Sequence, residues 1–180
     1  MNTSSELIRD FVNTLHKDPA GNEEELTTPA ELVRWLSAHA LLGGKGRATA
    51  RDVQAAVQLR EALRVLLLAN NGVEVDTAPA YGVLDAAARR ARVELRFGSA
   101  GPGLAPGAAG VRGALGGIAA AVQAALADGS WPRLKACRAR DCEWAFLDTA
   151  KNQSRAWCSM RSCGNREKAR AFRRRQSVSS

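Results

Sequence analysis

Residues 137–142 read CRARDC and residues 158–163 read CSMRSC, which makes two Cys-x4-Cys pairs with fifteen residues between them. The intervening segment is long enough for a hairpin, and each pair fits one short loop. Zinc binds four thiolates in a tetrahedron, at about 2.3 Å from each sulfur, and two such loops supply them without strain. Four buried structural thiols or a redox pair are the alternatives that the spacing leaves open. We expect one zinc ion per chain, with Cys137, Cys142, Cys158 and Cys163 as its ligands.

The cysteines lie in the basic part of the chain. Residues 131–180 hold 13 Lys or Arg and 4 Asp or Glu, whereas residues 1–130 hold 13 and 14. The net charge of +8 therefore comes from the last fifty residues. A basic module beside a neutral body is typical of a protein that binds a polyanion, although a solvated basic tail has the same composition. Because so short a segment has few large apolar side chains, a bound metal would supply much of its stability.

The rest of the sequence predicts a helical body. The chain has 180 residues, of which 46% are apolar and 24% charged, as in ordinary globular proteins, but only 5% are aromatic. Apolar side chains recur with helical spacing in five segments, near residues 4–15, 28–41, 49–71, 79–90 and 107–128. Residues 93–97 alternate apolar and polar side chains, which indicates one β-hairpin.

The fold class that we expect is mainly α (α+β), in two parts. Residues 1–130 form a helical domain with one small β-hairpin, a candidate for sensing or dimerisation. Residues 131–180 form a four-cysteine zinc module, a treble-clef or zinc-ribbon-like hairpin followed by a basic helix. We expect Trp144, Phe146 and Trp157 to build a small core of its own for this module, with stacking on nucleic-acid bases as the alternative.

The basic helix, from Asn165 to about Gln176, is the expected polyanion contact. At 3.6 residues per turn, four arginines fall within an arc about 100° wide, namely Arg166, Arg170, Arg173 and Arg174. Phe172 lies outside this arc, and we expect it to pack on the zinc module. The residues that we expect to contact nucleic acid are Arg155, Arg161, Arg166, Lys168, Arg170, Arg173, Arg174 and Arg175.

Several segments of the chain resemble one known family. The segments WPRLKAC (131–137), CEWAFLD (142–148) and CGNR (163–166) are similar to the CGNR zinc-finger family, and DFVNT (10–14) is similar to the start of its N-terminal ABATE domain. The resemblance implies that the four cysteines bind zinc and that Gly164, Asn165 and Arg166 shape the second loop. Members are described as candidates for stress-induced transcription regulation, and RNA binding has been suggested for their zinc module. Leu147 departs from the family pattern, in which a tyrosine is common there.

These observations lead to one expected function and two alternatives. We expect a zinc-dependent transcription regulator that binds nucleic acid, DNA rather than RNA, and that also has a small-molecule effector and a homodimeric form as candidate partners. The alternatives are an RNA-binding zinc protein and a small-molecule sensor whose zinc module is a structural or protein-interaction element. An enzyme is not expected, because His16 and His39 are the only histidines and zinc with four cysteine ligands has no open position for water.

A second candidate site lies in the first helix, where Asp10 and Asn13 are three residues apart beside the apolar stripe. They are candidates for binding a ligand, although we favour the alternative that they satisfy backbone groups at a helix junction. We expect a cytoplasmic protein without a membrane span, because the first residues lack an export signal and the apolar stretch 114–127 is short. The ratio of 21 Arg to 5 Lys indicates a high-GC bacterial genome.

Overall fold

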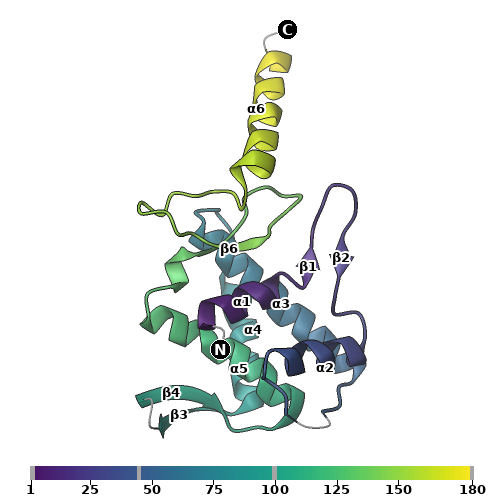
Figure 1. The fold of residues 1–180 in the computed structure, drawn as a ribbon, viewed down its shortest axis with the longest axis vertical. Coiled ribbons are helices and arrows are strands. Elements are labelled where there is room, and N and C mark those ends of the chain that lie inside the picture. Colours follow the sequence, from purple (N-terminus) through teal and green to yellow (C-terminus); the bar gives the residue numbers. More distant parts are fainter. Residues whose placement is uncertain (1–2, 44–45, 99–100, 179–180) are drawn as a thin grey trace.

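The computed structural model describes residues 3–43, 46–98 and 101–178 (Figure 1). Its helices are α1 (Ser4–Val12), α2 (Pro29–Ala38), α3 (Ala50–Asn70), α4 (Ala78–Ala91), α5 (Gly110–Ala127) and α6 (Asn165–Val178). Its strands are β1 (Leu15–His16), β2 (Glu23–Glu24), β3 (Val93–Gly98), β4 (Gly101–Pro106), β5 (Leu134–Ala136) and β6 (Ala145–Leu147). A 3-10 turn over Trp131–Arg133 and a π turn over Met160–Gly164 complete the order. The mainly helical fold with small hairpins is confirmed.

Capping residues in the sequence explain where three helices begin. Helices α2 and α3 start at capping boxes formed by Thr28 and Thr49, each of which exchanges hydrogen bonds with an acidic residue three positions later. Helix α1 has the same device at Thr3, whose side chain accepts from the Glu6 amide. Thr3 is the cap, and not Ser4 or Ser5, because only Thr3 has an acidic residue three positions later.

The strands pair in three antiparallel hairpins. The predicted hairpin is confirmed as β3–β4, in which Val93 pairs with Pro106 and Leu95 with Leu104. The short β1–β2 pair, between Leu15 and Glu24, was not predicted, since two-residue strands leave no alternation in the sequence. The third hairpin, β5–β6, lies in the cysteine region and pairs Leu134 with Leu147.

Helix α5 crosses the centre of the helical body. A Cβ on Gly116 would stand 2.0 Å from the Cβ of Ala91, so only glycine lets α5 approach the end of α4 this closely. Small residues in α5 therefore permit this close crossing. Among the described residues, α5 is the one helix long and apolar enough to cross a membrane by length and composition, and half of it is buried inside the protein.

The cysteine region and the helical body share one apolar core, which corrects our expectation of separate cores. Trp131, Leu134, Ala136 and Ala145 belong to the same buried cluster as the side chains of α1, α3 and α5. A smaller cluster surrounds the cysteines and includes Phe146, with Trp144 and Trp157 packed against it. The β5–β6 hairpin therefore has one face on the body and the other under the cysteines. The sequence could not indicate this, because two strands of three residues are too short for a pattern that shows which element each face packs on.

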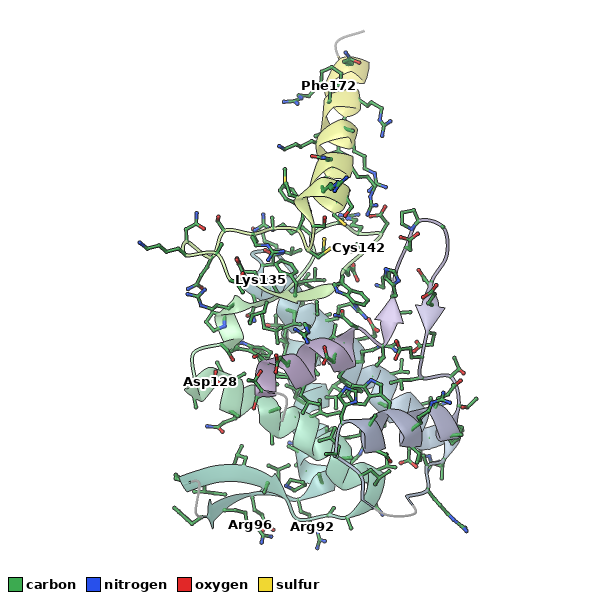
Figure 2. All side chains as sticks on the ribbon, in the orientation of Figure 1. Arg92, Arg96, Asp128, Lys135, Cys142 and Phe172 are labelled. Carbon is green, nitrogen blue, oxygen red and sulfur yellow. The ribbon has the colours of Figure 1, made fainter. Side chains whose placement is uncertain are left out.

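Helix α6 projects away from the rest of the molecule (Figure 1). Figure 2 shows Phe172 near the outer end of α6 and Cys142 close to its base. Phe172 is 55% exposed, so our expectation that it packs on the zinc module is wrong. The helix leaves the cysteine region in a direction that carries its second half beyond the reach of any other element.

Candidate metal centre and nucleic-acid interface

The four cysteines form one compact group. Their Sγ atoms all lie within 4.8 Å of one another, with 3.6 Å between Cys142 and Cys158 and 3.8 Å between Cys158 and Cys163. A tetrahedron with sulfur atoms about 2.3 Å from its centre has edges of about 3.8 Å, whereas a disulfide needs about 2.05 Å. The observed separations therefore fit a metal with four thiolate ligands and not a pair of disulfides. The predicted ligand set is brought together as one metal site.

The electrostatics of the group also call for a cation. Hydrogen bonds from Cys142 and Cys158 lower the pKa of Cys137 to about 2, whereas hydrogen bonding to Cys137 raises the pKa of Cys158 to about 12. Hydrogen bonding to Cys137 also raises the pKa of Cys142. Four sulfurs this close cannot all be charged unless a positive ion lies among them, because like charges repel. A divalent metal removes this conflict, so the donor set fits zinc.

Backbone hydrogen bonds shape the loops that present the sulfurs. The Cys137 amide donates to the Trp144 carbonyl, and the Cys142 amide donates to the Ala139 carbonyl. In the second loop the Gly164 amide donates to the Ser159 carbonyl. A Cβ on Gly164 would lie 2.4 Å from the sulfur of Met160, so the glycine of the CGNR segment leaves room for this neighbour.

A buried ion pair stabilises the hairpin beneath the loops. Lys135 Nζ lies 2.8 Å from Asp148 Oδ2 and also donates to the Gln153 carbonyl at 2.5 Å. Asp148 is fully buried. Burial opposes its charge, but Lys135 and the backbone amides of Ala150 and Arg155 together outweigh burial and hold the pKa of Asp148 below its ordinary value. Lys135 thus joins β5 to the segment that connects the two cysteine loops.

The end of α3 holds the cysteine region from below. Asn70 Nδ2 donates to the carbonyls of Trp131 and Leu134 at 2.9 and 3.1 Å. Asn71 Nδ2 donates to the carbonyls of Ala136 and Ala156 at 2.7 and 2.9 Å. Our sequence analysis did not identify these contacts. The two adjacent asparagines were the sole hint, because their partners lie more than 60 residues away in the chain.

Asn13 joins α1 to the cysteine region. Its Nδ2 donates to the Ala145 carbonyl at 3.0 Å, and its Oδ1 accepts from the Ala145 amide at 2.8 Å. Asn13 is only 8% exposed. Its amide therefore satisfies backbone groups at a junction, the alternative that we favoured, and both of its polar atoms are already used.

Together with Asn13 and Ala145, Asp10 lines a cavity of about 730 Å³ between the body and the cysteine region. Its Oδ1 pairs with Arg9 Nε at 2.8 Å. The cavity is lined by stacked rings of Trp35 and His39, 3.8 Å between centroids, and by Phe146. The ligand-binding role of Asp10 stays a prediction.

Two buried arginines of α3 complete the junction. Arg64 Nη2 donates to the Val12 carbonyl at 2.7 Å, and its Nη1 donates to the Glu143 carbonyl at 2.8 Å. Arg60 pairs with Glu24 at 2.6 Å, and both arginines contact Glu61. Burial opposes the charge on Glu61, but Arg64 and Arg60 outweigh it and hold the pKa of Glu61 below its ordinary value. One helix thus fixes α1, β2 and the first cysteine loop at once.

Two arginines of the predicted basic arc are occupied within the protein. Arg166 Nη2 lies 3.0 Å from Asp141 Oδ1, and Arg170 Nη2 lies 2.7 Å from Asp141 Oδ2. Arg170 also pairs with Glu167 at 2.6 Å, and Arg166 Nη2 approaches the Cys163 sulfur at 3.5 Å. Hydrogen bonding from Arg170 holds the pKa of Asp141 below its ordinary value. These two arginines fix α6 to the first cysteine loop, which the helical arc alone could not reveal.

The remaining basic residues of the prediction differ in their surroundings. Arg155 turns toward the hairpin, where its Nη2 donates to the Cys158 carbonyl at 2.7 Å and its guanidinium lies 4.9 Å from the Phe146 ring centroid. Arg174 and Arg175 lie on the exposed outer part of α6. Within the described residues, three predicted side chains are exposed and have no hydrogen bond or ion pair, namely Arg161, Lys168 and Arg173. Arg140, in the first cysteine loop, is also exposed and has no hydrogen bond or ion pair from its side chain among the described residues. It was not among the residues that we predicted from the sequence.

Two family models match the chain. The CGNR zinc finger matches residues 133–176, and ABATE, described as "Putative stress-induced transcription regulator", matches residues 5–129. These matches confirm the resemblance that the cysteine loops and the DFVNT segment indicated. A search of curated proteins finds no significant match.

Proposed function

Because the chain belongs to the ABATE family and carries a CGNR zinc finger, we propose that it is a zinc-dependent transcription regulator that binds DNA. The observation that carries this proposal is the projecting α6 helix, placed directly after the four-sulfur centre, with Lys168 and Arg173 exposed and without a partner among the described residues. One Zn²⁺ per chain would hold the two cysteine loops and so fix the base of this helix. The metal is structural in this proposal, and no catalytic role is assigned to the chain.

The basic side chains without protein partners are the proposed phosphate contacts. Lys168 and Arg173 lie on α6, and Arg140 and Arg161 lie on the loops at its base. Side chains that have no acidic partner need not break an ion pair when they meet a phosphate. Arg166 and Arg170 would act indirectly, since their contacts with Asp141 hold the helix in place.

The form of α6 supports duplex DNA over RNA. The described side chains from Phe172 to Gln176 are all exposed, and this half of the helix projects away from the body (Figure 1). A bare helix about 10–12 Å wide fits the major groove of B-DNA, which is about 12 Å wide. The major groove of duplex RNA is deep and narrow and does not admit a helix.

The experiment is a salt titration of binding to a duplex DNA pool with the zinc-loaded full chain. The test variant carries Arg161→Gln, Lys168→Gln and Arg173→Gln. The control variant carries Arg34→Gln, Arg89→Gln and Arg96→Gln, which removes the same charge from exposed positions on the body. The slope of log affinity against log salt should fall by roughly 0.9 for each phosphate that the test variant no longer binds, and should hardly change in the control.

Equal slopes for wild type and test variant, with zinc still bound, would show that α6 is not the interface. A single-stranded RNA of the same length is titrated in parallel. Tighter binding to RNA at each salt concentration would favour the alternative of an RNA-binding zinc protein. A role in stress responses fits the family description, and a cytoplasmic location in a bacterium is a further part of this proposal. Homodimerisation stays a prediction, which sedimentation of the purified chain would test.

A further inference from the structure

A cleft of about 770 Å³ lies in the helical body. Three arginines line it, Arg51 from α3, Arg90 from α4 and Arg112 from α5. These residues are far apart in the sequence, and only the packing of three helices brings them to one cavity. They therefore form a basic cluster in a part of the chain whose net charge is close to zero.

The three arginines have no partner within the described part of the chain. None of them makes a hydrogen bond or an ion pair there, whereas other arginines on the same body do, such as Arg89 with Asp85. Asp52 is the one acidic residue in the lining, and its carboxylate already accepts hydrogen bonds from the amide and hydroxyl of Thr49, at 2.8 and 2.7 Å. Three guanidinium groups therefore face one carboxylate in the lining, and positive charge predominates at this cleft.

The floor of the cleft is apolar. Leu59 and Leu115 are buried members of the main core, and Val83 packs against that core from α4. Small alanines of α3 and α4 complete the floor, which leaves space between the helices. A bare phosphate or sulfate would use the guanidinium groups but would leave this apolar surface in contact with water.

We propose that this cleft binds a small amphiphilic carboxylate, an organic acid with one charged head and an apolar body. The guanidinium groups would bind the head in bidentate pairs, and the floor would cover the apolar part. The volume lies within the range of about 300–1,000 Å³ that is usual for small-molecule sites. This site is independent of the DNA interface, because none of its lining residues lies in the cysteine region or in α6.

The probes are octanoate, decanoate and 1-naphthylacetate, each added to the zinc-loaded full chain and measured by isothermal titration calorimetry. Acetate and 1-decanol are the matched compounds, one without the apolar body and one without the charge. At least one of the three carboxylates should bind with a dissociation constant below about 1 mM, and both matched compounds should bind at least about tenfold more weakly.

Two variants locate the site. Replacing Arg51, Arg90 and Arg112 together by Gln should weaken binding at least about tenfold, whereas the body control with Arg34→Gln, Arg89→Gln and Arg96→Gln should leave it unchanged. Gly82→Leu should abolish binding by filling the cleft. A Cβ at Gly82 meets no atom within 4 Å, and leucine favours a helix more than glycine does, so this variant keeps the fold.

Three results would overturn the proposal. The first is that none of the three carboxylates binds with a dissociation constant below about 1 mM. The second is that 1-decanol binds as well as decanoate, which would remove the role of charge. The third is that both variants bind as the wild type does, which would place the ligand elsewhere.

Discussion

Asn13→Ala should destabilise the whole protein by about 2–6 kcal/mol, because it removes both hydrogen bonds between α1 and the cysteine region. The Ala145 carbonyl accepts one of these bonds at 3.0 Å, the Ala145 amide donates the other at 2.8 Å, and Ala145 is fully buried. After the substitution neither group has a partner in the protein. A buried polar group without a partner costs about 1–3 kcal/mol, and two such groups lead to the stated range.

The assay is urea unfolding of the zinc-loaded chain, followed by circular dichroism and by a colorimetric zinc indicator. Because the two regions share one core, both signals should move together to lower urea. Asn152→Ala is the control, since Asn152 is exposed and has no hydrogen bond among the described residues, and it should change stability by less than about 0.5 kcal/mol. Zinc release that shifts while the helical signal does not would refute the shared core.

The metal centre, the exposed end of α6 and the buried ion pairs each lead to one further prediction. Metal analysis should find about one zinc per chain. Either a chelator or Cys158→Ser should also lower the melting temperature of the body helices, and an unchanged melting temperature would contradict this prediction. Phe172→Ala should leave the melting temperature unchanged, because the side chain is exposed, and a destabilisation of more than about 1 kcal/mol would mean that it packs on something. Glu61 has a lowered pKa in the folded protein, so its charge stabilises the fold above pH 4.5, its ordinary value, and this contribution is lost as the pH falls through the lowered pKa. The difference in stability between wild type and Glu61→Gln, measured by urea unfolding from about pH 7 to about pH 3, should therefore shrink below pH 4.5 and should not grow.

Local features of this protein could be predicted because they depend on near neighbours in the chain. The capping boxes at Thr28 and Thr49 use residues three positions apart, and the turn at Gly129 needs the positive φ of 76° that glycine adopts readily. The cysteine loops follow the same rule, since each Cys-x4-Cys pair closes on itself. For these features the sequence alone was sufficient.

The tertiary structure decided which polar groups meet across long separations. Asn13 reaches Ala145, Arg64 reaches Glu143, and Arg166 pairs with Asp141, none of which a periodic pattern can indicate. The sequence predicted correctly that the basic segment after Asn165 is a helix. Packing at the base of this helix decided which of its arginines pair with Asp141. The physical reason is that charge and hydrogen-bonding capacity belong to a residue, whereas the partner that satisfies them is chosen only when the helices and hairpins pack.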